Sequence, residues 1–325
     1  VSLTRPDGRL DPAAVGWARH PLVDTSGIGR GRWGRNKRWE YWNITTPTHI
    51  MALTVSSIDY AAVHEVWVFD RATQKTWSRT SMTVPARGVE FAPSFERGPT
   101  VARARGLEIG IDPSSDGSGT RLRARIADAS FDVVADLPEG HERLCVVVPW
   151  SEDRFQYTVK DVARPAHGTL TIEGATYDVP AGASWAVLDH GRGRWPYGVR
   201  WNWGAGSGVS YGRVIGIQVG GGWTEGTGMT ENAITIDGRL HKIHAELEWR
   251  YDIGEWQQPW HVGGGGLDAS FTPFYDKSKH VSIGVISSST DQCFGHWSGT
   301  FRTADGQDIP FDDVLGWAEE AHIRW

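Results

Sequence analysis

The chain has 325 residues, of which 39% are hydrophobic and 22% are charged, and its formal net charge is −6. This size and composition are typical of one large or two ordinary globular domains with an ample core. The negative charge argues against a nucleic-acid partner, because no basic excess is present to neutralise phosphates. No stretch approaches the run of about 18 apolar residues that indicates a transmembrane helix.

The two cysteines, Cys145 and Cys293, are too few for a disulfide framework, and neither lies in a Cys-x-x-Cys motif. A reducing compartment is the simplest interpretation, and the first residues lack the apolar region of a signal peptide. We therefore expect a cytoplasmic protein. The sequence leaves its oligomeric state open.

Short segments in which apolar and polar residues alternate recur along the chain, and this period of two indicates strands with one buried face. In chain order, the clearest of these segments are 62–70, 121–126, 169–179, 185–189, 214–219, 243–251 and 267–274. Asp-Gly and Glu-Gly turns separate many of them. Helical patterns are confined to 12–19 and 313–321. Many short strands, few helices and no β-α-β alternation predict an all-β barrel or sandwich.

Residues 185–204 hold the most unusual composition, since they contain an Asp-His pair, three arginines, one tyrosine and four tryptophans. A buried tryptophan covers roughly 150–250 Å² and needs a partner for its N–H group. A cluster of this kind around one acid predicts an aromatic pocket with a single proton donor or acceptor in its wall.

Asp189 is the acid in this cluster. On a strand it shares a face with Trp185 and Val187, while His190 points to the opposite face or into a turn. Burial among apolar side chains favours the neutral acid, which can donate a proton to an alkene, ether or hydroxyl group. The structural alternative is that Asp189 caps a turn at 191–193 or pairs with Arg192, Arg194 or Arg200.

The neighbouring aromatic residues Trp195, Tyr197, Trp201 and Trp203 would stabilise a developing cation if they line this pocket. The alternative is ordinary core packing. Glu231 and Asn232 precede a strand and its turn, and we expect them to add a second carboxylate and an amide to the same cavity.

Two segments match the letters of known sequence motifs but lack the structural context that those motifs require. The glycines of 29–34 and 208–212 resemble dinucleotide-binding and nucleophile-elbow motifs, but neither lies between a strand and a helix. His241 and His244 point to opposite faces of a strand, so we interpret His241 as a satisfied core histidine, with pocket lining as the alternative. No dense group of metal-ligating residues occurs elsewhere, and we expect neither a metal nor a cofactor.

The chain resembles a bacterial family of proteins with a domain of unknown function. The resemblance extends over about residues 17–325 and adds Trp260 and His296 to the candidate ligand-binding residues. The segments that carry it are 37–42, 188–197, 201–204, 230–234, 237–242, Trp260, 267–273, 294–299 and 305–306.

That family is in turn similar to the double-lipocalin proteins that include carotenoid hydratase. Those chains have a Tyr-x-Asp-His-Asn-Trp-Gly-like segment, then a Trp-x-Trp strand and an Asp-Gly turn. Here 188–193, 201–203 and 237–238 fill these places. The resemblance implies two lipocalin-like barrels and a proton-donating role for Asp189. Val187 stands where the hydratase has a tyrosine, which removes a polar partner of the acid.

We therefore predict an all-β protein of two packed lipocalin-like antiparallel barrels with few helices, the first over 1–237 and the second over 238–325. Its expected ligand is a hydrophobic or amphipathic small molecule, such as an isoprenoid or polyketide. Asp189, Tyr197 and Glu231 are the predicted catalytic residues of a cofactor-independent hydration, dehydration, isomerisation or cyclisation. The predicted ligand-binding residues are Trp185, His190, Arg194, Trp195, Trp201, Trp203, Asn232, His241, Trp260 and His296.

Two other functions remain open at this point. A non-catalytic lipocalin-like carrier would hold the same ligand without changing it. A carbohydrate-processing enzyme would use Asp189 and Glu231 as a pair of acids roughly 5–9 Å apart.

Overall fold

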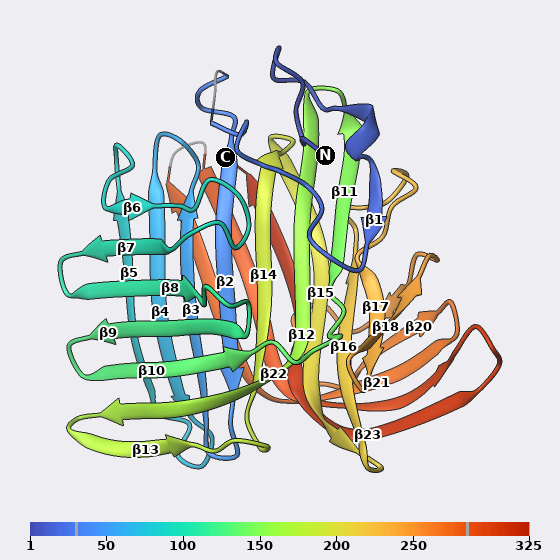
Figure 1. Ribbon diagram of the computed structural model, residues 1–325. Helices are drawn as coiled ribbons and strands as arrows, with labels where there is room; N and C mark the ends of the chain where they lie inside the picture. The colour runs from blue at the N-terminus through green and yellow to red at the C-terminus, as the bar shows by residue number, and fades with distance from the viewer. Residues whose placement is uncertain (30–31, 284–285, 325) are drawn as a thin grey trace. The chain divides into compact units, whose positions relative to one another are not determined.

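The computed structural model describes residues 1–29, 32–283 and 286–324, and most of these residues belong to antiparallel strands (Figure 1). These residues form two compact units, Val1–Trp195 (unit 1) and Pro196–Trp325 (unit 2). The boundary expected from the sequence, after residue 237, lies inside unit 2 in the turn between two paired strands. Among the described residues, no helix has the length and hydropathy needed to span a bilayer.

Unit 1 contains one antiparallel sheet, which in the described residues has 14 strands. Most of them follow the order β5-β4-β3-β2-β14-β12-β10-β9-β8-β7-β6, while β11 and β13 also pair with β12, and β1 pairs with β11. The strands are β1 (Gly16–Ala18), β2 (Lys37–Thr45), β3 (His49–Ser57), β4 (Ala62–Asp70), β5 (Thr76–Thr83), β6 (Val89–Glu90), β7 (Thr100–Ala104), β8 (Leu107–Pro113), β9 (Gly119–Ile126), β10 (Ala129–Asp136), β11 (Leu144–Ser151), β12 (Arg154–Ile172), β13 (Ala175–Val179) and β14 (Trp185–Arg194).

The long strand β12 makes this sheet fold back on itself. Its pairing with β14 is interrupted by an irregularity between Asp161 and Arg164, where Ala163 has a φ of 58°. The first half of β12 pairs with β14 and β11, and the second half pairs with β10 and β13. In Figure 1, β7–β10 consequently run across β2–β5. Trp42 and Leu53 from one layer and Leu122 and Phe131 from the other share one hydrophobic core.

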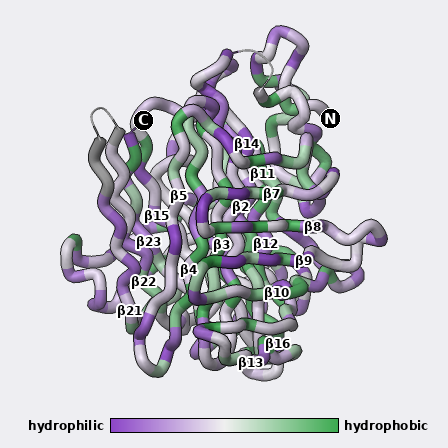
Figure 2. The backbone as a smooth tube through the Cα atoms, turned by 90° about the vertical axis from the view of Figure 1, so that its left-hand side faces the viewer, coloured by the Kyte–Doolittle hydropathy of each residue, from purple (hydrophilic) through white to green (hydrophobic). Residues whose placement is uncertain are grey.

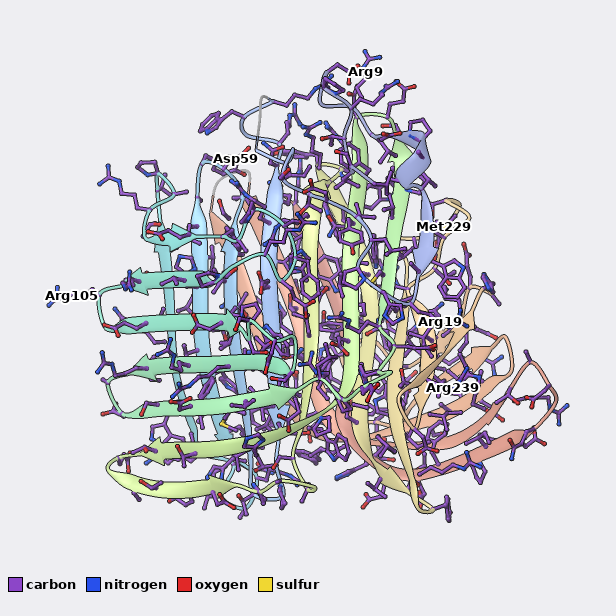
Figure 3. The ribbon with its side chains drawn as sticks, in the orientation of Figure 1. Arg9, Arg19, Asp59, Arg105, Met229 and Arg239 are labelled. Carbon is purple, nitrogen blue, oxygen red and sulfur yellow. The ribbon has the colours of Figure 1, made fainter. Side chains whose placement is uncertain are left out.

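The strand β9 shows why alternation predicted the strands of unit 1 well. Its apolar residues are buried, and Arg121, Arg123 and Arg125 lie between them on the exposed face. In Figure 2, hydrophilic and hydrophobic residues alternate along β8, β9 and β10 in the same way. Each arginine lies 2.6 Å from an acid on a neighbouring strand: Asp132, Asp112 and Glu108 in that order. Figure 3 shows Arg105 projecting from the β7–β8 turn beside this face.

The segment before β2 covers another part of the unit 1 core. Leu3, Leu10, Ala14 and Ile28 pack against residues of β11 and β12 in a second hydrophobic cluster. The helix expected over 12–19 is shorter than predicted, because only Pro12–Ala14 form a 3-10 helix (η1), and β1 then pairs with β11. Backbone pairing with an open sheet edge thus replaces the continuation of the helix.

Unit 2 also contains one antiparallel sheet, with nine strands in its described part and the order β18-β17-β16-β15-β23-β22-β21-β20-β19. Its core includes Ile217, Ile234, Trp260, Phe271 and Trp297. The strands are β15 (Gly198–Ser210), β16 (Arg213–Gly221), β17 (Asn232–Ile236), β18 (Arg239–Ile243), β19 (Glu248–Arg250), β20 (Trp260–Gly264), β21 (Leu267–Ile283), β22 (Ile286–Arg302) and β23 (Asp308–Arg324).

Two predicted elements of unit 2 differ from the structure. The helix expected at 313–321 is wrong, because these residues belong to β23, which pairs with both β15 and β22. The strand expected at 243–251 is interrupted, since Ile243 ends β18 and β19 begins at Glu248. Between them, the Asn232 side chain donates a hydrogen bond to the Ala245 carbonyl at 3.2 Å, in place of a strand partner.

Candidate functional site

Asp189 lies in β14, between Tyr41 of β2 and Lys160 of β12 in the sheet register. As alternation predicted, it shares one face of the strand with Trp185 and Val187, and His190 points to the other face, which carries core residues such as Leu188. We call the face with Leu188 the inner face of unit 1 and the face with Asp189 its outer face. β14 continues through 191–193 to Arg194, so no turn is present there for Asp189 to cap.

The carboxylate of Asp189 is surrounded by donors. The Lys160 ammonium lies 3.2 Å from Oδ1, the Thr158 hydroxyl donates to Oδ1 at 3.2 Å, and the Trp39 indole N–H donates to Oδ2 at 3.0 Å. All three contacts are hydrogen-bond donors or cations that face the carboxyl group, whereas the sequence led us to expect apolar groups around it. The ion-pair partner is a lysine, and not one of the three arginines considered from the sequence.

Aromatic rings lie beside this ion pair. Trp39 contacts Trp195 edge to face with ring centroids 5.4 Å apart, and Trp150 contacts Trp195 in the same way at 5.3 Å. The Trp195 N–H donates to the Gln156 side chain at 2.7 Å. Trp39 lies directly over Gly191, where a Cβ atom would be 2.3 Å from two ring carbons. A glycine at 191 is therefore required for the tryptophan to reach Asp189.

His190 belongs to a different environment on the inner face. Its Nδ1 lies 3.6 Å from Oε1 of Glu40, and its ring contacts Phe95 at 4.8 Å. Arg192 lies 3.3 Å from the same carboxylate, and Thr100 donates to it at 2.8 Å. Burial and the nearby Arg192 lower the pKa of His190 to about 4, so its imidazole is neutral at pH 7.

Glu40 remains ionised within this group. Burial opposes its ionisation, but contacts with His190, Arg192 and Thr100 outweigh burial and lower the pKa of Glu40. Arg194, the other predicted binding residue on this face, donates from Nε to the Asn36 side chain at 3.0 Å and also hydrogen bonds the Gly8 carbonyl. Its contacts tie β14 to the preceding segments of unit 1.

The buried His190 predicts acid sensitivity. Its folded pKa of about 4 lies below the ordinary value of 6.5, so the unfolded chain binds more protons between these pH values. The contribution of His190 to the free energy of unfolding is therefore fully present above pH 6.5. It decreases by about 3 kcal/mol as the pH drops towards 4. The urea midpoint of unit 1, measured at pH 7.0 and 4.5, should fall less for His190→Gln than for the native protein. Equal falls would contradict this assignment.

Other predicted residues lie in unit 2 and serve local contacts. The N–H groups of Trp201 and Trp203 donate to Glu319 at 2.8 Å and to Gln218 at 2.9 Å. Tyr197, just before β15, is 45% exposed and its ring lies under the Arg324 guanidinium at 5.5 Å.

Glu231 and Asn232 anchor the start of β17. Glu231 is buried and accepts a hydrogen bond from the Trp223 N–H at 2.6 Å. Asn232 accepts from the Gly220 backbone N–H at 2.6 Å. Both therefore have a structural contact of their own within unit 2.

The remaining three candidates are on separate strands of unit 2. Half-buried His241 of β18 contacts Phe301 at 6.0 Å, and His296 of β22 contacts Phe274 at 5.4 Å. Trp260 of β20 is buried and stacks on Tyr251 at 4.1 Å. Across the described residues, no three His, Cys, Asp or Glu side chains meet in a metal-binding arrangement.

The structure thus brings Asp189 and Trp195 together in unit 1, where Trp39, Thr158 and Lys160 complete the site. Trp185 shares the face of β14 with Asp189 but lies four residues away along the strand. Sequence reasoning missed Trp39, Thr158 and Lys160. They stand on β2 and β12, and only the register of those strands with β14 places them beside Asp189.

Comparison with solved structures shows the fold. Kievitone hydratase from Nectria haematococca has a TM-score of 0.55 and 11% identity, with 95% of this chain and 94% of that chain covered. A candidate AttH protein from Nitrosomonas europaea has a TM-score of 0.56 and 12% identity, covering 96% and 98%. CghA with Sch210972 has a TM-score of 0.53 and 11% identity, also covering 96% and 98%. At these identities the similarity concerns the fold alone.

The expected fold is confirmed, since the chain is all-β and consists of two lipocalin-like antiparallel units. No curated protein sequence matches the chain. Residues 1–325 match the family described as domain of unknown function DUF2804. The protein therefore belongs to the DUF2804 family.

Proposed function

We propose that the protein binds a hydrophobic or amphipathic small molecule and carries out cofactor-independent acid–base chemistry on it. The observation that carries this proposal is the Asp189–Lys160 pair, whose charged atoms lie 3.2 Å apart beside Trp39. The residues are only 9% and 6% exposed. A buried ionisable group with a specific charged partner is a candidate for a functional site. A hydratase among the proteins of similar fold supports the same class of reaction.

The pair offers a base and an acid side by side. In a dehydration, Asp189 would take a proton from carbon while Lys160 protonates the departing hydroxyl group, and the C–O bonding electrons leave with water. Hydration is the reverse sequence. Proton removal and return at two carbons gives isomerisation. Because donors surround Asp189, we assign it the role of proton acceptor. The role of proton donor, which the sequence assigned to Asp189, then falls to Lys160.

The aromatic residues would bind the apolar part of the substrate. Trp39 and Trp195 offer ring faces and edges that would shield a developing positive charge from water. Trp185, on the same face of β14, stays a predicted contributor. Tyr197 and Glu231 stay predicted contributors from unit 2. The carbohydrate function also stays a prediction, because it requires a distance between Asp189 in unit 1 and Glu231 in unit 2.

Asp189→Asn tests the proposed function. We expect turnover to fall by about 10²–10⁴-fold, because the amide cannot accept the proton. The assay incubates the protein in D₂O with a panel of tertiary allylic alcohols and unsaturated ketones. Mass spectrometry then follows the gain or loss of water and the uptake of deuterium. Asp178→Asn, on the exposed strand β13 of the same unit, is the matched control.

Full turnover by Asp189→Asn would rule out the catalytic assignment. A ligand that co-purifies unchanged with both the native protein and Asp189→Asn, without turnover of the panel, would favour the carrier function instead.

A further inference from the structure

A pocket lies on the inner face of unit 1, which is the face opposite to that of Asp189. It has a volume of about 170 Å³. One wall is the segment around η1 and β1, and the other is formed by Cys145, Val147 and Tyr157 of β11 and β12. Arg19, labelled in Figure 3, directly follows β1 and marks this segment.

The sequence explains why this space is not filled. The segment that faces β11 is Ala13-Ala-Val-Gly-Trp-Ala18, in which four of six residues are alanine or glycine. The pairing of β1 with β11 holds its backbone in place, from Gly16 opposite Val147 to Ala18 opposite Cys145. Small side chains on a fixed backbone cannot close the gap to the opposite wall.

Tyr157 supplies an unused polar group in this wall. Its side chain is 0% exposed, and apart from the Cys145 thiol beside it, a weak acceptor, its hydroxyl has no hydrogen-bond partner among the described residues. Burial and the neighbouring Cys145 raise the pKa of Tyr157 far above its usual range, so the hydroxyl keeps its proton. A buried hydroxyl without a strong acceptor is unfavourable, and a ligand oxygen would remove this penalty.

The other groups in the deep wall are uncharged. Burial raises the pKa of Cys145 to about 12, so its thiol remains neutral. Val147 and Ala14 are apolar and buried. Val1 and His20 also line the pocket, but both are exposed, and the Val1 ammonium is bonded to the Leu22 carbonyl. A charged ligand against the deep wall would therefore lose hydration without a counter-charge beside it, whereas a neutral ligand would not.

We propose that this pocket binds a small neutral molecule with an apolar ring or branched chain and one acceptor oxygen, as in a ketone or ether. The Tyr157 hydroxyl donates a hydrogen bond to that oxygen. The size fits, because an apolar cavity of about 150 Å³ holds benzene. This site is separate from the proposed catalytic pair, since Tyr157 and Lys160 have opposite orientations along β12.

Acetophenone and α-methylstyrene test the proposal, because they have nearly the same shape and only the ketone has an acceptor oxygen. We expect the native protein to bind the 4′-fluoro derivative of acetophenone about tenfold more tightly than that of α-methylstyrene, as one neutral hydrogen bond predicts. Ligand-observed ¹⁹F NMR titration measures both affinities. In Tyr157→Phe the preference should disappear, with α-methylstyrene affinity within twofold of the native value.

Two further variants complete the design. Tyr177→Phe, on the exposed strand β13, is the matched control and should keep the native preference. Ala14→Phe places a ring in the pocket and should weaken both ligands at least tenfold. Thermal unfolding checks that each variant is folded. Absence of binding to the native protein, an unchanged preference in Tyr157→Phe, or undiminished binding to folded Ala14→Phe would each overturn the proposal.

Discussion

Arg164→Met is expected to destabilise unit 1 by about 3–5 kcal/mol, the range measured when one partner of a buried ion pair is removed. Arg164 is only 1% exposed and donates from Nη1 to Asp161 Oδ2 at 2.8 Å. It also donates from Nη2 to the Ala135 carbonyl at 2.5 Å and from Nε to the Asp136 carbonyl. The variant removes the donors to a buried carboxylate and to two backbone groups at once.

The position of Arg164 makes this loss larger than that of an ordinary ion pair. It directly follows the irregularity in β12 and stands two residues before Ala166, where the strand begins to pair with β10. Although burial opposes ionisation, Arg164 and His141 lower the pKa of Asp161 to about 2, so the carboxylate is charged at neutral pH in the native protein. Urea unfolding at pH 7 followed by tryptophan fluorescence measures the loss.

Arg125→Met is the matched control, because the Arg125–Glu108 pair is exposed and should contribute less than about 1 kcal/mol. Asp161→Asn in the Arg164→Met background should recover part of the stability, since it removes the unpaired charge. A loss no larger than that of Arg125→Met would show that Arg164 does not hold the corner of β12.

Lys160→Met is the second variant with a large expected effect, about 3 kcal/mol, because Asp189 would keep a buried charge without a counter-ion. Trp39 and Thr158 still donate to the carboxylate, which places the loss at the lower end of the usual range. Asp189→Asn alone should also destabilise the protein, since Lys160 is then buried beside a neutral amide. Activity should be lost in both.

The double variant Lys160→Met, Asp189→Asn distinguishes an ion pair from two independent residues. Its free energy of unfolding should exceed the value expected from adding the two single losses by about 1–3 kcal/mol. Urea unfolding of the four proteins gives this coupling energy. Strict additivity would mean that the two charges do not interact in solution.

The sequence predicted the faces of β14 because the period of two acts within one strand. Trp185, Val187 and Asp189 share a face, and His190 lies on the other, as alternation requires. The partners of Asp189 could not be found in this way. Lys160 precedes it by a long stretch of chain, and its place opposite Asp189 depends on the register of β12. Nothing in the local pattern around 160 marks that pairing.

The helix predicted over 313–321 shows where a local pattern gives the wrong element. β23 lies between β15 and β22, and 317–321 is buried on both faces, so polar and apolar residues do not alternate there. A short, doubly buried strand and a helix have similar apolar patterns. Asp313, with a φ of 59°, lies where the pairing with β22 shifts register. Pairing with β15 and β22 therefore made these residues a strand, although their local pattern favoured a helix.

Each unit contains one of the chain's two cysteines, Cys145 on β11 and Cys293 on β22, and both are buried as free thiols. Burial raises the pKa of each, which keeps them unreactive while their strands remain packed. A thiol-modifying reagent therefore records the opening of each unit separately. The order in which the two residues are alkylated will report which half of the molecule unfolds first, without any engineered probe.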